Sequence, residues 1–323
     1  MKSLFALLTI ISSLMMTGHS PTRQDPVETV RIDSDLVDLN VSVFARNAER
    51  SNRPLTKQDF RIYEDGVPQE IAFFATADKP FDLVLMLDLS ASTSKKLRMI
   101  KRSAKRFVDT ARPSDRVAIV TFTDRTSLLS NFTFDRKQSK QRIDEIKNAV
   151  GGTNFWDAMS FVLKEVIPGK EHLRRSAIVV MSDGVDNALP DVPGPGSRIT
   201  FDRLIVELRL SDAIVFPIYL DTEEADVKRY NMPRSAYALA RSQLEMIAAE
   251  SGTGLYRAAK LKDLDHLYNR ILSDLSTVYS IGYRPGKPPV EGAWRTVAVE
   301  LVDQPELLAR TRKGYYSKGA ASQ

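Results

Sequence analysis

The hydrophobic pattern of the chain changes its character twice. Apolar and polar residues alternate over residues 28–79, give way to continuous apolar runs and helical spacings from about residue 80, and alternate again from Val278. Alternation is typical of strands with one buried face, whereas short continuous runs are typical of strands buried on both faces. The pattern therefore predicts a β segment, an α/β segment and a second β segment, in that order along the chain.

The two outer segments have strand signals but little length. Residues 36–44 place Leu39, Val41 and Val43 on one face, and further strands are expected at 30–33, 60–74 (two strands around a turn at 64–66), 279–283, 295–301 and 308–316. Neither segment is long enough to form a stable domain by itself. We expect residues 28–79 and 278–316 to form one small β-sandwich-like domain with a domain inserted in it, followed by a tail at 317–323.

The inserted segment, residues 80–277, alternates strands with helices. Apolar runs predict buried strands at 81–87, 116–122, 176–181 and 213–219, with shorter strands at 126–131 and 254–256. Helical spacing is found at 95–111, 138–150, 154–167, 202–210, 238–250 and 262–275. This alternation predicts an α/β fold, a doubly wound and mainly parallel sheet covered by helices on both faces.

The first twenty residues are typical of an export signal. Lys2 precedes an uncharged run from Leu4 to Met16, and small residues follow before Pro21. The run is shorter than the roughly 20 residues that a membrane-spanning helix needs, and no later segment is long enough to span. We expect residues 1–20 to be a signal peptide and the protein to be exported to the periplasm or beyond the cell. The alternatives are a buried N-terminal element or retention of the segment as an anchor.

Composition excludes several kinds of chemistry. The chain has no Cys and only three His, which excludes disulfides, thiolate metal sites and Cys nucleophiles and is poor material for a Ser–His–Asp triad. Lys and Arg exceed Asp and Glu by 46 to 41, and this small excess predicts no nucleic-acid partner. Residues 95–111 carry seven Lys and Arg, which is typical either of a patch for an anionic partner or, more commonly, of a solvated helix face.

Oxygen-bearing side chains follow the predicted strands at the points where those strands end. Asp88, Ser90 and Ser92 follow the strand expected at 81–87, and Asp183 follows the strand expected at 176–181. Thr153 lies in Gly151-Gly-Thr-Asn154, just before the helix expected at 154–167. Ligands bind at the carboxyl ends of strands in such sheets, so these loops should meet at one edge. Two carboxylates and three hydroxyls are hard ligands that suit Mg²⁺ or Mn²⁺. An acidic group of a partner could then complete the coordination.

Each of these loops has an ordinary structural interpretation when taken alone. Ser and Asp are common turn residues after strands, Ser182-Asp-Gly184 is typical of a turn, and Thr153 or Asn154 would serve as a helix cap. The metal interpretation rests on the three loops together, in order and after elements of the right type. The runner-up is a domain that carries these residues and works without metal.

The three loops resemble the metal-ion-dependent adhesion site of the von Willebrand factor type A domain, over about residues 80–277. The resemblance implies that Ser90, Ser92 and Thr153 bind a metal directly, and that Asp88 and Asp183 act directly or through water. Ala91 and Thr93 depart from the usual family residues, but neither position supplies a ligand. Segments 55–71, 280–285 and 312–316 resemble a group of exported bacterial proteins related to this family, in which β segments bracket the A domain.

The sequence thus predicts a binding or adhesion module rather than an enzyme. The chain would capture an acidic residue of a protein partner through the metal. One alternative is a structural envelope protein that assembles through metal-independent contacts. The other is a Mg²⁺-dependent phosphoester hydrolase, against which stands the lack of a phosphate-binding Gly-rich loop, a nucleophile elbow or a second Asp in place of Ser90. The pattern leaves the oligomeric state open.

Overall fold

The computed structural model describes residues 36–45, 54–76, 79–167, 174–230, 232–258, 261–288 and 290–317. The expected signal peptide, the strand expected at 30–33 and nearly all of the tail lie outside these ranges. All described residues belong to one compact unit that starts at Asp35. None of the helices in the described part is both long and apolar enough to cross a membrane.

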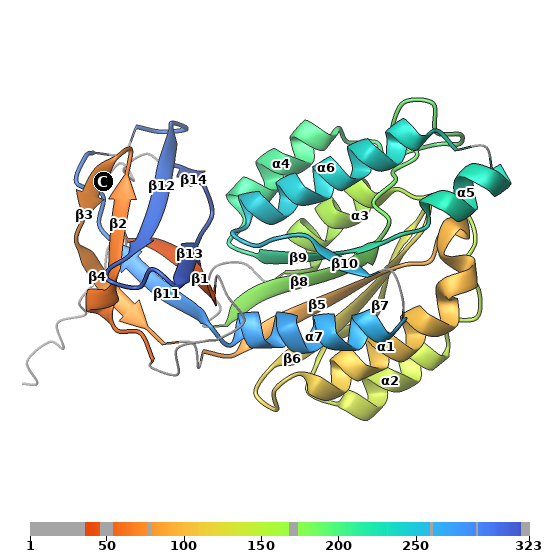
Figure 1. Ribbon diagram of the computed structural model, residues 1–323, viewed down its shortest axis with the longest axis horizontal. Helices are drawn as coiled ribbons and strands as arrows, with labels where there is room; N and C mark the ends of the chain where they lie inside the picture. The colour runs from red at the N-terminus through yellow and green to blue at the C-terminus, as the bar shows by residue number, and fades with distance from the viewer. Residues whose placement is uncertain are drawn as a thin grey trace, which may run out of the picture. The chain divides into compact units, whose positions relative to one another are not determined.

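The centre of the fold is a six-stranded sheet of order β10-β9-β8-β5-β6-β7 (Figure 1). Its strands are β5 (Phe81–Asp88), β6 (Arg116–Phe122), β7 (Thr126–Thr133), β8 (Arg175–Ser182), β9 (Ile214–Leu220) and β10 (Tyr256–Ala258). All neighbours are parallel except β7, which runs antiparallel to β6 at the edge. Every residue of β5 and β9 is buried, as the continuous apolar runs predict.

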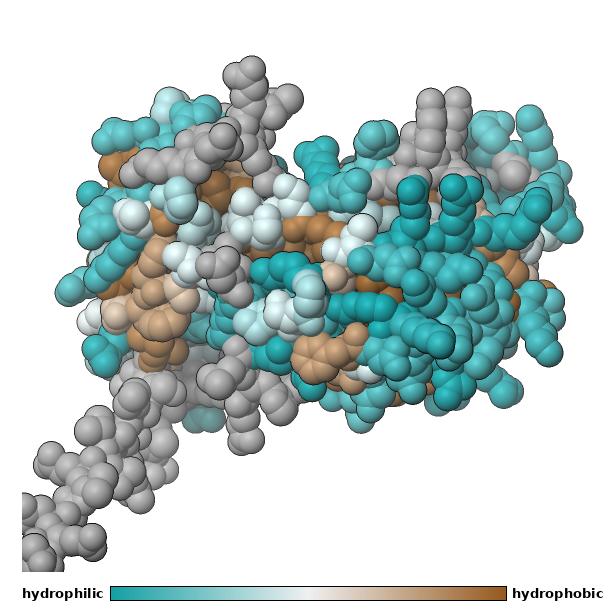
Figure 2. Space-filling view, turned by 90° about the horizontal axis from the view of Figure 1, so that it is seen from below, coloured by the Kyte–Doolittle hydropathy of each residue, from teal (hydrophilic) through white to brown (hydrophobic). Residues whose placement is uncertain are grey.

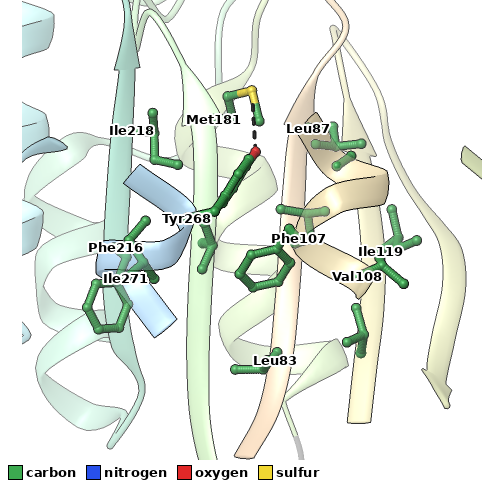
Figure 3. Packing of buried hydrophobic residues seen from close by; sticks show 14 of the residues in the cluster. Leu83, Leu87, Phe107, Val108, Ile119, Met181, Phe216, Ile218, Tyr268 and Ile271 are labelled. Carbon is green, nitrogen blue, oxygen red and sulfur yellow. Dashed lines mark hydrogen bonds between the residues drawn. The ribbon is translucent and has the colours of Figure 1, made fainter. Parts of the chain in front are cut away.

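Helices cover both faces of this sheet (Figure 1). One face is covered by α1 (Leu97–Thr110), α2 (Arg136–Asp144) and α7 (Leu261–Leu275), and the other by α3 (Phe155–Phe161), α4 (Phe201–Leu210) and α6 (Arg234–Glu250). Figure 3 shows Phe107 of α1 and Tyr268 of α7 packed over β5 and β8, with the Tyr268 hydroxyl 4.0 Å from the Met181 sulfur. Each such buried side chain contributes about 1.5–3 kcal/mol by leaving water. The predicted α/β fold class is confirmed.

Several element boundaries differ from the sequence prediction for local reasons. The helix expected at 138–150 begins earlier, because the Asp135 carboxylate caps it by accepting from the Gln138 N–H, and it ends at Asp144. The helix expected at 154–167 changes to a π-helical turn, η3 (Val162–Val166). Three elements were not predicted, η1 (Lys57–Asp59), η2 (Ala91–Lys96) and α5 (Glu223–Tyr230), since none of them has an apolar periodicity. The helix expected from 238 starts at Arg234, and the strand expected at 254–256 lies at 256–258.

The two flanks of the chain pair with each other. They form sheets of order β13-β1-β11-β4 and β14-β12-β2-β3, in which β1 pairs with β11, β11 with β4, and β12 with β2. These strands are β1 (Val37–Ala45), β2 (Phe60–Glu64), β3 (Val67–Gln69), β4 (Ile71–Ala75), β11 (Val278–Tyr283), β12 (Trp294–Leu301), β13 (Leu307–Arg310) and β14 (Gly314–Tyr316). The strand expected at 308–316 is thus two strands. Residues of both flanks share one hydrophobic core, so neither flank can bury its apolar face without the other.

We call residues 36–76 and 278–317 the β region and residues 81–275 the α/β region. Buried Arg175, at the start of β8, joins them: its guanidinium donates to the Val278 carbonyl, to the Ser280 hydroxyl at 3.0 Å and to the Thr76 carbonyl at 2.9 Å. Arg312 forms an ion pair with Asp212. These contacts lie at the amino ends of the sheet strands, away from the edge that carries the predicted site.

Candidate metal centre

The predicted loops meet at the carboxyl edge of the central sheet. The loop after β5 is tied to β6 by the Leu89 N–H, which donates to the Phe122 carbonyl at 2.9 Å. It is tied to the glycine loop by the Ala91 N–H, which donates to the Gly151 carbonyl at 3.1 Å. Parallel strands end at one edge, so the order of the sheet brings together loops far apart in sequence.

Asp88 is fully buried and organises the first loop. One carboxylate oxygen accepts from the Ser90 N–H at 2.9 Å, and the other accepts from the Ser182 hydroxyl at 2.5 Å. The hydroxyl of buried Thr93 donates to the carbonyls of Asp88 and Ser90, both at 2.9 Å. These bonds close the turn on both sides, so that the positions of Ser90 and Ser92 are fixed by the loop itself.

Asp183 joins the third loop to the first. Its Oδ2 accepts from the Ser92 hydroxyl and from the Thr222 hydroxyl, each at 2.7 Å, and its Oδ1 accepts from the Val185 N–H at 3.1 Å. The Ser90 and Ser92 hydroxyl oxygens are 3.0 Å apart. Four of the five predicted ligands therefore belong to one hydrogen-bonded cluster, in which Asp88 is joined to the others through the Ser90 N–H.

Thr153, the fifth predicted ligand, is held by its backbone. Its N–H donates to the Asn187 side-chain oxygen at 2.8 Å, and its carbonyl accepts from the Asn187 N–H at 2.9 Å. A Cβ at Gly152 would lie 2.7 Å from the Asn187 side-chain nitrogen, so a larger residue there would displace the side chain that holds Thr153. The Thr153 side chain is 5% exposed, and its hydroxyl makes no hydrogen bond to another described residue. That hydroxyl is therefore available to a ligand.

Four residues that position the loops were not predicted from the sequence: Ser182, Thr222, Asp186 and Asn187. Asp186 is fully buried and accepts from the Trp156 N–H at 3.0 Å and the Ser197 hydroxyl at 2.6 Å, which fixes both the start of α3 and the loop at residues 188–197. Thr222 follows β9 by two residues, so the strand-end rule that located Asp88 and Asp183 would have found it. Asn187 gives no comparable signal, because its role depends on the path of the loop.

The two carboxylates lie in an environment that opposes their negative charge. Burial, together with the charge of Asp183, raises the pKa of Asp88 to about 7. Burial also raises the pKa of Asp183, although three hydrogen bonds to its oxygens act in the opposite direction. Neither carboxylate has an ion-pair partner among the described residues. The described part of the chain also contains no group of three or more His, Cys, Asp and Glu that could hold a metal, so a metal here depends on the hydroxyls.

A cavity of about 270 Å³ opens beside this cluster, between η2 and α5. Its walls carry both signs of charge and include Ser92 and Thr222 as well as Lys95, Lys96, Asp221, Glu224, Asp226 and Arg229. The Lys96 ammonium donates to the Asp221 carbonyl, and burial lowers the pKa of Lys96. The space next to the candidate ligands is thus bordered by charged side chains of both signs.

Comparison with known proteins finds a family model that matches part of the chain. Residues 83–185 match the family model of the von Willebrand factor type A domain, a span that contains all three candidate loops. The resemblance inferred from the loops is therefore confirmed for this part of the chain. None of the curated proteins compared with the chain matches it.

Solved structures of similar fold come from animals and bacteria. Proximal thread matrix protein 1 from the mussel byssus, in a structure with a zinc-occupied MIDAS motif, has 17% identity and a TM-score of 0.48 over 67% of this chain. The match spans half of the mussel protein's length. BatB from Bacteroides thetaiotaomicron has 16% identity and a TM-score of 0.45 over 61% of this chain and all of that one. The vWF domain of the pilus tip protein Mfa5 from Porphyromonas gingivalis has 14% identity and a TM-score of 0.45, over 61% and 96%.

Proposed function

We propose that this chain is an exported binding module that holds a divalent metal at Asp88, Ser90, Ser92, Thr153 and Asp183 and captures an acidic residue of a protein partner through that metal. The three serine and threonine hydroxyls would bind the ion, and the two carboxylates would bind it directly or through water. The metal would supply an electrophilic centre at the edge of the sheet. The function of the protein residues is to hold that centre and leave one side of it open.

The main support is the pair of buried carboxylates without an ion-pair partner among the described residues. Burying unpaired negative charge is costly, and a cation between the carboxylates would remove that cost. The hydroxyl groups of Ser90, Ser92 and Thr222 lie within hydrogen-bonding distance of one another or of Asp183, so oxygen ligands are concentrated at that point. Only two of the five predicted ligands carry charge, so a bound divalent ion would keep its affinity for a further anion.

The donor set favours Mg²⁺ or Mn²⁺ over zinc. All five predicted ligands are oxygen atoms, which suit Mg²⁺ and Mn²⁺, whereas zinc favours His nitrogen and Cys sulfur. The chain has no Cys, and His266 is an exposed residue of α7, outside the three loops. A bound Mg²⁺ usually retains water ligands, and a carboxylate from a partner can replace one of them.

Calorimetric titration with Mg²⁺, Mn²⁺ and Zn²⁺ tests the proposal. We expect one site per chain for Mg²⁺ and Mn²⁺, and a loss of affinity of more than about 100-fold in Asp183→Ala and in Asp88→Ala, because each substitution removes a charged ligand. Asp124→Ala is the matched control, since it removes an exposed carboxylate at the same edge of the sheet. The heats of metal binding to Asp124→Ala should equal those of the wild type.

Partner capture is then tested in envelope extract, with and without EDTA. A partner held through the metal is retained by the wild type and by Asp124→Ala, and is released by EDTA. Equal Mg²⁺ heats in the wild type and Asp88→Ala would rule out the site. Hydrolysis of a phosphate ester that both Asp88→Ala and Asp183→Ala abolish would instead favour the hydrolase alternative. Self-association that is indifferent to EDTA would favour the assembly alternative.

A further inference from the structure

Positive charge is concentrated on one layer of the molecule. The elements η2, α1 and α2 together contain eleven Lys and Arg and two Asp, a formal charge of +9. The whole chain has a formal charge of only +5, so the remainder is net negative. Figure 2 shows hydrophilic residues over much of the face to which α1 and α2 belong. A charge asymmetry of this size creates a local positive potential that attracts anionic partners.

Part of this positive charge is used within the protein, and part is not. Lys101 donates to the carbonyls of Asp144 and Ile146, at 2.9 and 2.7 Å, and Lys105 pairs with Asp144 at 2.8 Å. These two lysines hold α2 against α1. In contrast, Lys95, Arg98 and Arg102 are exposed and have no hydrogen-bond or ion-pair partner among the described residues.

The exposed cations form a line. Lys95, Arg98, Arg102 and Arg106 follow one another at intervals of three, four and four residues, so they lie on one face of the helix. We call these four residues the cationic stripe. At 1.5 Å per residue the stripe is roughly 16 Å long, with charges about 6 Å apart.

The cationic stripe begins at the candidate metal centre. The element η2 follows Ser90 directly and contains Ser92, and Lys95 lies in the same element. Lys95 also lines the cavity that Ser92 and Thr222 share. The cavity beside the candidate metal centre and the cationic stripe therefore share Lys95.

We propose that the cationic stripe binds an extended acidic segment of the same partner whose carboxylate binds the metal, an inference that rests on the function proposed above. In an extended chain, side chains two residues apart lie on one face at a spacing of about 6.6 Å. This spacing matches the roughly 6 Å between successive cations of the stripe. The recognised segment thus carries an acidic residue at the metal and further acidic residues at alternate positions after it.

The stripe is poorly suited to the other common anionic partners. Phe107 is the only aromatic residue of α1 and α2 and it is buried, so bases of a nucleic acid find no exposed ring on which to stack. Leu97 and Met99 pack against the core, so α1 offers little apolar surface to insert into a lipid layer. A carboxylate-rich peptide segment is therefore the anionic partner that best complements the cationic stripe.

Fluorescence anisotropy with two labelled seven-residue peptides tests the proposal. One peptide has Glu at positions 1, 3, 5 and 7 with Ser between them, and the other has the same composition with the four Glu together. With Mg²⁺ present, we expect the alternating peptide to bind more tightly, and Arg98→Glu/Arg102→Glu to weaken its binding about tenfold. The control Lys57→Glu/Arg284→Glu makes the same charge change at two exposed cations of the β region and should weaken binding less than about threefold.

The outcomes separate this inference from the proposed function. The double reversal at Arg98 and Arg102 should leave the calorimetric affinity for Mg²⁺ unchanged, and in EDTA a weaker binding that depends on the stripe should persist. The inference would be overturned by equal losses of affinity in the two double variants or by no peptide binding to the wild type. It would also be overturned if a thymidine oligonucleotide or anionic vesicles bound more strongly than the peptide. In each case normal Mg²⁺ heats would leave the metal site intact. Missing Mg²⁺ heats with stripe-dependent binding retained would overturn the proposed function alone.

Discussion

The two regions of the molecule bury carboxylates in opposite ways. In the β region, Glu64 is 3% exposed, and one of its oxygens accepts from the Arg295 guanidinium at 2.8 Å. Its other oxygen accepts from the hydroxyls of Tyr283 and Tyr315, at 2.6 and 2.8 Å. In the α/β region, Asp88 and Asp183 are equally buried, but their partners are hydroxyls and backbone N–H groups.

This difference distinguishes a carboxylate with a structural role, Glu64, from two carboxylates that are candidate ligands, Asp88 and Asp183. The negative charge of Glu64 is neutralised within the protein, and its effect is felt by its neighbours: burial and Glu64 together raise the pKa of Tyr315 to about 12. Asp88 and Asp183 have no such neutralisation, and the pKa of each is raised instead. A buried carboxylate therefore becomes a candidate ligand only when the protein leaves its charge uncompensated.

The largest difference expected between the two regions is in their ability to fold when expressed alone. We infer that residues 80–277 form an inserted domain that folds alone, because both of its hydrophobic clusters are built from the α/β region with only Val278 added. The β region needs strands from both flanks in each sheet. Residues 80–277 expressed alone should show a cooperative unfolding transition in circular dichroism. An unfolded fragment from a chain that is folded at full length would refute the independence of this domain.

The next effect is the loss of the cation beside Glu64. Arg295→Met leaves a buried, unpaired carboxylate, so we expect the free energy of unfolding of the β region to fall by about 3–5 kcal/mol. Arg284→Met, at an exposed position of the same region, should change it by less than about 0.5 kcal/mol. Urea unfolding followed by tryptophan fluorescence gives both values, since Trp294 lies on β12 next to Arg295. A loss below 1 kcal/mol in Arg295→Met would show that the pair does not compensate this charge.

The sequence was sufficient to predict features that depend on local pattern. Continuous apolar runs located β5, β6, β8 and β9, and the ends of β5 and β8 indicated where Asp88 and Asp183 lie, whereas their role as metal ligands stays a prediction. The pairing of the flanks was predicted as well, because each flank was too short to bury its own apolar face. These inferences succeed because burial on both faces and the position of strand ends leave direct traces in the order of residues.

Features that depend on three-dimensional placement were not predictable in the same way. Glu64 and Arg295 are separated by 231 residues, and nothing near either one indicates that they meet. Asn187 supports Thr153 because the loop after β8 returns to the glycine loop, a path that the sequence pattern does not reveal. The short helix α5 was missed because its sequence has a single large aliphatic residue, Val227, and no periodicity.

The smallest effect expected is a pH dependence that separates the two kinds of carboxylate. The pKa of Asp88, about 7, is above its ordinary value, so without metal the folded state binds more protons than the unfolded state between about pH 4 and 7. Stability should therefore be highest at the acidic end of this window and decline as the pH rises, by on the order of 2 kcal/mol between pH 5 and pH 8.

Metal should reverse this trend, because a divalent ion binds the deprotonated carboxylates and competes with protons. Urea unfolding at pH 5 and pH 8, in EDTA and in excess Mg²⁺, measures the effect. Asp88→Asn serves as the control in which the decline in EDTA is smaller, while the pH response of the other groups is retained. A wild type whose stability in EDTA is the same as that of Asp88→Asn at both pH values would mean that the charge of Asp88 is compensated after all.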